Sequence, residues 1–201
     1  MPGLRNNSEG IALNKTYSKR DIEELFKNLD KKLEEEVEIV AIGGTALSLT
    51  GNRSFSKDID FCYSKCKFPS DFAQTAVDAG KEIGINKKDI EMFSGFEMTL
   101  LELPEFGERA IPYKGLSLRH IKLKTMHPFD IILSKIYRGE PKDMQDVENL
   151  VNDGQINLNQ LKTRFIEVAK SQKDWDVRRE FMKKYNDFIE NYTPSKTNQP
   201  H

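Results

Sequence analysis

Residues 42–61 read IGGTALSLTGNRSFSKDIDF and contain the two features that decide the fold. The run that enters this stretch, EIVAI (residues 38–42), is short and β-branched, which is typical of a buried strand. It stops at the diglycine Gly43-Gly44. A short helix is expected over residues 45–49, because an apolar run there is closed by another glycine. The pattern therefore predicts a strand, a glycine turn and a helix in immediate succession.

An acidic pair, Asp58 and Asp60, lies in a second predicted strand over residues 57–63. Side chains two residues apart on a strand point to the same face. The two carboxylates are therefore expected side by side, while Ile59 and Phe61 enter the core. Adjacent negative charges repel unless a cation lies between them. Mg²⁺ binds carboxylates together with substrate phosphates and water, so the pair predicts a Mg²⁺ site.

The diglycine predicts a phosphate site at the same edge of the sheet. Glycines between a strand and a helix let the backbone approach a ligand closely. A helix start also presents free N–H groups and a partial positive charge, and Thr45 adds a hydroxyl there. Taken alone, an acidic pair is commonly a solvated strand face, and a diglycine is commonly a turn. Their combination favours a phosphate cradle and a metal clamp that face one ligand.

The rest of the chain predicts an α+β fold, in which a mixed sheet is flanked by helices and followed by a helical lobe. Further strands are expected at residues 96–103, 109–113 and 117–124. Helices are expected from a Ser18 cap to about Glu36, over 71–83, from 127 onwards, and over 143–151, 158–170 and 175–191. These segments divide the chain into a flexible N-terminus (1–16), a core (17–126), a helical region (127–193) and a disordered tail (194–201).

Composition excludes several classes of protein. The chain has 201 residues, 37% hydrophobic and 31% charged, as in globular proteins with a charged surface. A net charge of -1 gives no global attraction for nucleic acid, so such a contact would need a local patch. Without an apolar run of about 18 residues or an apolar signal core, we expect a cytoplasmic protein with no membrane partner. Cys62 and Cys66 are interpreted as free thiols, with a metal or redox pair as the alternative.

Two motifs carry a resemblance to a known superfamily. Residues 42–61 resemble the signature of the nucleotidyltransferases with the polymerase-beta-like fold, which is a hydrophobic residue, Gly-Gly or Gly-Ser, a spacer and two acidic residues. The wording GGTAL followed by DID is most similar to the abortive-infection toxin branch and its minimal nucleotidyltransferase relatives. The later motif of that branch, a lysine-bearing helix before a basic-D-x-x-D segment, resembles DIILSKIYRG (130–139) and KDMQDV (142–147).

The resemblance implies which residues hold the substrate and the metal. Its triphosphate-binding set would be Gly43, Gly44, Thr45, Ser56 and Lys57. Asp58 and Asp60 would be catalytic ligands of two Mg²⁺ ions, or of Mn²⁺ in their place. A third carboxylate normally comes from a neighbouring strand. Glu102 is the best-placed candidate for this catalytic and metal-binding role, because it lies between hydrophobic residues, and Glu97 and Glu91 are the alternatives.

The later motif implies roles for Lys135 and Asp146. Lys135 would bind the nucleotide phosphates, or stabilise the charge that develops on the leaving pyrophosphate. The alternative is a surface lysine on an amphipathic helix. Asp143 and Asp146 lie three apart on one helical face and could orient Lys135 or the nucleotide. Alternatively, they are carboxylates that the helix dipole favours near a helix N-terminus.

The resemblance thus implies a metal-dependent enzyme that moves a nucleoside monophosphate from a nucleoside triphosphate to a hydroxyl. The acceptor would be a tRNA-like RNA or a protein, and the enzyme would be the toxin of a toxin-antitoxin pair whose partner is an antitoxin protein. One alternative is a nucleotide-binding regulatory module of the same fold without transfer activity. Another is a metal-dependent nuclease that uses the acidic pair on nucleic acid.

Overall fold

The computed structural model describes residues 15–63, 69–93, 101–154 and 156–192. Its strands are β1 (Tyr17–Ser18), β2 (Val37–Ala41), β3 (Phe55–Ser56), β4 (Ile59–Tyr63), β5 (Ile90–Phe93), β6 (Ile111–Pro112) and β7 (Ile121–Thr125). Its α-helices are α1 (Lys19–Lys32), α2 (Gly43–Thr50), α3 (Phe72–Glu82), α4 (Phe106–Arg109), α5 (Pro128–Arg138), α6 (Pro141–Asn152), α7 (Leu158–Ser171) and α8 (Trp175–Asn191). A short 3₁₀ helix (Lys87–Asp89) precedes β5. The predicted α+β fold is confirmed.

The main sheet has five strands in the order β5-β4-β2-β7-β6. β2 runs antiparallel to β4 and parallel to β7, and β4 runs parallel to β5, so the sheet is mixed as predicted. The separate pair of β1 and β3 is antiparallel and places Tyr17 opposite Ser56. This small pair ties the loop before β4 to the start of α1.

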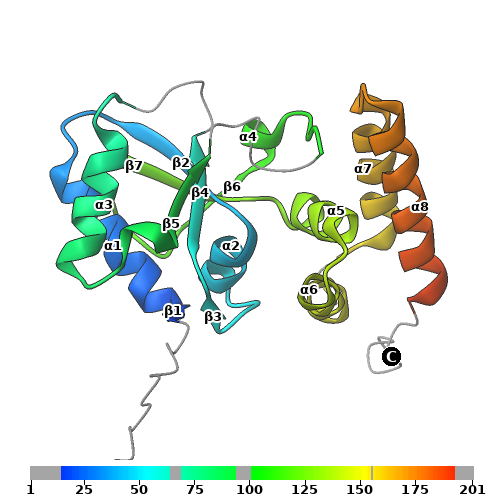
Figure 1. Cartoon of the computed structure of the whole chain (residues 1–201), viewed down its shortest axis with the longest axis horizontal. Coiled ribbons are helices and arrows are strands. Elements are labelled where there is room, and N and C mark those ends of the chain that lie inside the picture. Colours follow the sequence, from blue (N-terminus) through cyan, green and yellow to red (C-terminus); the bar gives the residue numbers. More distant parts are fainter. Residues whose placement is uncertain (1–14, 64–68, 94–100, 155, 193–201) are drawn as a thin grey trace, which may run out of the picture.

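Each face of the sheet buries its own hydrophobic core, because side chains alternate along every strand. On one face, Ile39, Ile59 and Phe61 pack with α1 and α3. On the other face, Val40 and Cys62 pack with α2 and with helices α5 to α8. Figure 1 shows these layers, with α1 and α3 on one side of the sheet and α7 and α8 outermost on the other.

The helical lobe shares its core with the sheet. Buried residues on both sides of the junction between β7 and α5, near residue 126, belong to one cluster. Within that cluster Phe165 stacks on Tyr185, with ring centroids 3.7 Å apart. Trp175, the first residue of α8, is instead 68% exposed. No helix among the described residues is both long and apolar enough to cross a membrane.

One expected strand is wrong in its described residues, and two strands begin later than expected. Residues 101–103 are not a strand, because the backbone N–H and C=O of Glu102 bond the side chain of Gln172 instead of a neighbouring strand. Residues 57–58 precede β4, which begins at Ile59, and the last long strand begins only at Ile121. β5 was not predicted, since four residues after a charged turn carry little periodicity. Residues 1–14, residues 96–100 and the tail from 193 lie outside the described part.

Asp30, which no motif indicated, joins α1 to the start of β7. Its buried carboxylate accepts hydrogen bonds from the backbone N–H groups of Arg119, His120 and Ile121, at 2.9, 2.7 and 2.9 Å. Burial opposes ionisation, but these bonds lower the pKa of Asp30 below its ordinary value. The carboxylate therefore caps the entry into β7.

We predict that Asp30→Ala lowers the free energy of unfolding by about 2–4 kcal/mol, because it leaves buried N–H groups without acceptors. The lowered pKa means that this contribution is present above the ordinary pKa of aspartate and is lost as pH falls through the folded value. Urea denaturation of both proteins at pH 7 and at pH 3 measures it. If the difference in free energy of unfolding between wild type and Asp30→Ala is the same at both pH values, the ionised cap is contradicted.

Candidate active site

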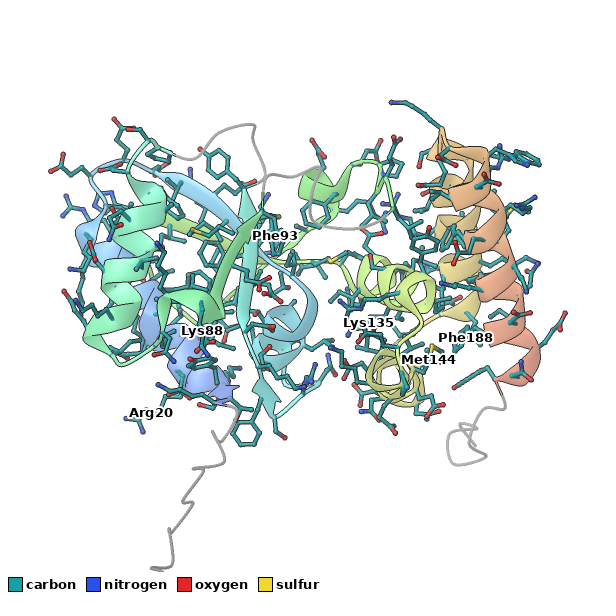
Figure 2. The ribbon with its side chains drawn as sticks, in the orientation of Figure 1. Arg20, Lys88, Phe93, Lys135, Met144 and Phe188 are labelled. Atoms are coloured by element: carbon teal, nitrogen blue, oxygen red, sulfur yellow. The ribbon has the colours of Figure 1, made fainter. Side chains whose placement is uncertain are left out.

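A cavity of about 260 Å³ lies between the main sheet and helix α5. The cavity is lined by residues from the main sheet and the ends of its strands, from the start of α2, from the loop before β4, from α5 and from the start of α6. They are Ile42, Gly43, Gly44, Arg53, Ser56, Lys57, Asp58, Asp60, Glu91, Phe93, Met126, Ile131, Ser134, Lys135, Arg138 and Lys142. Figure 2 shows Lys135 on the α5 side and Phe93 on the sheet side of this region.

Three carboxylates form the acidic wall of the cavity. Asp60 pairs with Glu91 across β4 and β5, and Asp58 lies in the bend just before β4. Burial, followed by the charges of Asp58 and Glu91, raises the pKa of Asp60 from 3.8 to about 7. The Oδ1 atom of Asp60 is buried and has no hydrogen-bond partner in the described structure. The structure therefore brings the predicted acidic pair together in one wall of the cavity.

The predicted diglycine adjoins this wall. A Cβ at Gly43 would lie 3.7 Å from Asp60 Oδ2, and Gly43 has a positive φ of 50°. A Cβ at Gly44 would lie only 2.6 Å from Ser56 Oγ and 3.3 Å from Arg53 Nη1. Only glycine therefore permits this approach without a shift. The start of α2 and the acidic pair meet, as the sequence predicted.

Thr45 has a structural position. Its side chain is fully buried, its Oγ1 accepts from the backbone N–H of Asp60 at 2.8 Å, and it donates to the carbonyl of Asp58 at 3.3 Å. The hydroxyl is thus occupied by the backbone of the acidic pair and does not line the cavity. It holds the two aspartates in place, in contrast to its predicted contact with phosphate.

Helix α5 forms the opposite, basic wall. Ile131, Ser134, Lys135 and Arg138 line the cavity at the spacing of one helical face. Lys135 is only 4% exposed, so the surface-lysine interpretation is wrong. Its Nζ lies 2.9 Å from Asp143 Oδ1 and 2.7 Å from Asp146 Oδ2, which come from α6.

Asp143 and Asp146 organise the cations of this wall. Arg138 makes two bonds to Asp143, at 2.5 and 2.6 Å, and Arg53 Nη1 lies 3.2 Å from Asp146 Oδ2. Although burial opposes ionisation, the bonds from Arg138 and Lys135 lower the pKa of Asp143 to about 2. Both aspartates contact Lys135, which is the arrangement that orienting this lysine requires. Asp146 does not line the cavity and reaches it through Lys135 and Arg53.

The third carboxylate is placed differently from the first choice. Glu102 does not line the cavity; its Oε1 lies 3.7 Å from Lys173 Nζ, and its backbone bonds Gln172. Glu91, the alternative on β5, lies beside Asp60 instead. The unpredicted strand β5 is the reason, because strand pairing decides which acidic residue faces the pair. Glu97 lies outside the described residues.

Ser56 and Lys57 line the cavity as predicted, and four further polar residues join them. Arg53, Ser134, Arg138 and Lys142 were not singled out. Arg138 and Ser134 carried a usable signal, since each lies three residues or fewer from Lys135 on the same helix. Arg53 carried no such sequence signal, because it comes from an irregular loop whose path the sequence pattern does not determine.

The residues fit a divalent cation that is shared with a ligand. No three His, Cys, Asp or Glu side chains in the described ranges lie close enough to enclose a metal by themselves. A cation beside Asp58 and Asp60 would therefore need further oxygen ligands from phosphate and water, which is how Mg²⁺ is usually held. Cys62 does not belong to the site: it is a buried free thiol whose pKa burial raises to about 12. Cys66 lies outside the described residues.

We predict that Lys135→Met destabilises the protein by about 3 kcal/mol, because it leaves Asp143 and Asp146 buried with fewer partners. Thermal unfolding should show a fall in Tm of roughly 10 °C for a chain of this size. Adding Asp143→Asn and Asp146→Asn to the same protein should restore part of the loss, since the uncompensated charges are then gone. A single variant as stable as wild type would show that the ion pairs contribute nothing.

Comparison with known proteins agrees with this arrangement. The model of one family, described as a nucleotidyltransferase of unknown function (DUF6036), matches residues 19–193. No curated protein and no solved structure matches the chain. The match extends from the first residue of α1 to beyond the end of α8, and so includes both motifs and the whole helical lobe. It confirms the resemblance at the level of nucleotidyltransferases, and the chain belongs to this family.

Proposed function

We propose that this protein transfers a nucleoside monophosphate from a magnesium-bound nucleoside triphosphate to a hydroxyl group. The acceptor oxygen forms a bond to the α-phosphorus, the bond from that phosphorus to the bridging oxygen breaks, and pyrophosphate leaves. The hydroxyl proton goes to solvent. Bound Mg²⁺ would neutralise the phosphates and lower the pKa of the attacking hydroxyl.

One observation carries this proposal: the buried, unpartnered Oδ1 of Asp60, beside Asp58 and Glu91. A carboxylate in this position is costly unless a cation reaches it. The diglycine and the basic residues of α5 line the same cavity as Asp60, and both suit phosphate. A ligand that carries both a divalent cation and phosphates satisfies both walls, and a magnesium triphosphate is such a ligand.

Different residues of the chain would bind the metal, bind the phosphates and stabilise the leaving group. Asp58 and Asp60 would hold the metal, and Glu91 lies beside Asp60 on the next strand. The backbone at Gly43 and Gly44, with Ser56 and Lys57, would bind the outer phosphates. Lys135 and Arg138, oriented by α6, would face the charge that develops on the leaving pyrophosphate. Because α6 already places these cations, no reorganisation of the wall is needed during the reaction.

The acceptor and the biological role follow from the resemblance alone. A tRNA-like RNA or a protein hydroxyl remains our expectation for the acceptor, and a toxin restrained by an antitoxin remains our expectation for the role. The basic residues at the cavity mouth, Lys57, Lys142 and Arg138, favour an anionic acceptor. Incubation with each α-labelled triphosphate, total tRNA and cell lysate tests both classes, because the label marks whichever molecule is modified.

We predict that Asp58→Asn and Asp60→Asn each reduce transfer of label by at least about 100-fold, because a carboxamide cannot neutralise the metal. Glu91→Gln should reduce it as well, and Glu102→Gln, the matched change outside the cavity, should leave it within about twofold. Unchanged transfer by either aspartate variant would refute the catalytic assignment. Triphosphate binding without transfer by the wild type would instead identify a regulatory module.

We also predict that Asp60 makes the metal-free protein less stable as pH rises. Because its folded pKa is about 7 and its ordinary value is 3.8, the folded chain holds a proton in between that the unfolded chain has lost. Stability therefore falls between about pH 4 and pH 7, by up to about 4 kcal/mol. Asp60→Asn should remove this fall when denaturation is measured in a chelator. Parallel pH curves for the two proteins would contradict the raised pKa.

A further inference from the structure

The cavity has a direction that is set by the sheet. At one end lie Gly43 and Gly44, which follow β2, and the residues just before β4. Next comes the row formed by Asp60 and its cross-strand partner Glu91. One step further along the same strands, the register pairs Cys62 with Phe93. The order along the sheet is therefore phosphate cradle, carboxylates, aromatic ring.

Phe93 faces the same side of the sheet as Glu91. Side chains two residues apart on a strand share a face, and two residues advance the strand by about 6–7 Å. Phe93 lines the cavity and packs only partly against the core of the helical lobe. Part of its ring is therefore open to a ligand. In Figure 2 it stands at the sheet, opposite Lys135 of α5.

Apolar side chains line the middle of the cavity. Ile42 and Met126, which follow β2 and β7, are buried beside the row of Asp60, and Ile131 lines the cavity from α5. The neighbouring Ser134 donates its hydroxyl hydrogen to the carbonyl of Asp130 at 2.8 Å. The charged lining residues that we assign to phosphate come from the loop before β4 and from the later turns of α5. The end at the diglycine thus suits an anionic group, and the partly buried ring of Phe93 beyond the carboxylates suits a flat apolar group.

We infer that the nucleobase of the donor triphosphate stacks on Phe93, with its outer phosphates at the diglycine. This inference rests on the proposed function and gives the nucleotide an orientation. The order of groups in the ligand (outer phosphates, α-phosphate, nucleoside) then matches the order of residues along the sheet. Phe93 is a positioning residue: its contact with the base fixes the α-phosphorus beside Asp58 and Asp60.

The test compares two ligands that differ in the nucleoside. Calorimetry with magnesium measures the Kd of ATP and of inorganic tripolyphosphate for wild type and for Phe93→Leu, which keeps an apolar side chain but loses the aromatic face. Base stacking on an aromatic side chain predicts that Phe93→Leu weakens ATP binding by roughly tenfold or more. Binding of tripolyphosphate should stay within about twofold. Equal weakening of both ligands, or of neither, would overturn the inference.

A fluorescent variant gives an independent readout. Phe93→Trp should retain ATP binding, and in a Trp175→Phe background it is the only tryptophan of the chain. Its emission should change on addition of ATP and not of tripolyphosphate. Phe55→Leu, at an exposed aromatic outside the cavity, serves as the matched control and should bind both ligands as wild type does. An emission that ignores ATP, in a protein that binds it, would also overturn the inference.

Failure of the proposed function looks different. If wild type binds neither ATP nor tripolyphosphate in the presence of magnesium, the triphosphate site itself is wrong. If wild type binds both and Phe93→Leu binds ATP equally well, the triphosphate site stands and the position of the base is wrong. Thermal unfolding of Phe93→Leu accompanies both measurements, so that a loss of fold is not mistaken for a loss of stacking.

Discussion

The site depends on how closely the start of α2 lies against the strand that carries the acidic pair. A side chain at Gly44 would meet Ser56 Oγ at 2.6 Å, so the approach exists only because there is none. Thr45 then bonds the backbone at Asp58 and Asp60. The close packing of α2 against β4 therefore positions both the backbone of the diglycine and the two carboxylates. The cradle and the acidic wall form one unit.

Charge is balanced differently on the two walls of the cavity. On the basic wall, Asp143 and Asp146 accept from Lys135 and its neighbours, so these cations are held without a ligand. On the acidic wall, Asp60 keeps a buried oxygen without a partner. The cation of a magnesium-bound ligand would pair with Asp60 on the acidic wall. The anionic groups of the ligand would compete with Asp143 and Asp146 for the basic residues. The helical lobe is thus part of the proposed active site: α6 contributes Lys142 to the cavity lining, and its Asp143 and Asp146 act through Lys135, Arg138 and Arg53.

Predictions from local pattern held where the physical cause is local. The strand before the diglycine, the helix after it and the meeting of both with Asp60 follow from alternation and from backbone freedom within twenty residues. The preference for Glu102 over Glu91 does not match the structure. Both residues lie in short apolar surroundings, and only strand pairing shows which of them lies beside Asp60. The lysine of α5 lines the cavity, but its burial depended on α6, which helical periodicity cannot position.

By itself, the sequence determined the α+β class, the resemblance of the chain to nucleotidyltransferases and the residue types that we propose hold phosphate and metal. These follow from spacing along one strand or one helix, which backbone geometry imposes wherever the segment lies. The tertiary structure alone decided that Glu91 completes the acidic wall, that Thr45 serves the backbone, and that Phe93 stands beyond the carboxylates. Such relations join segments far apart in the chain, and they depend on strand register and helix packing, which no local pattern encodes.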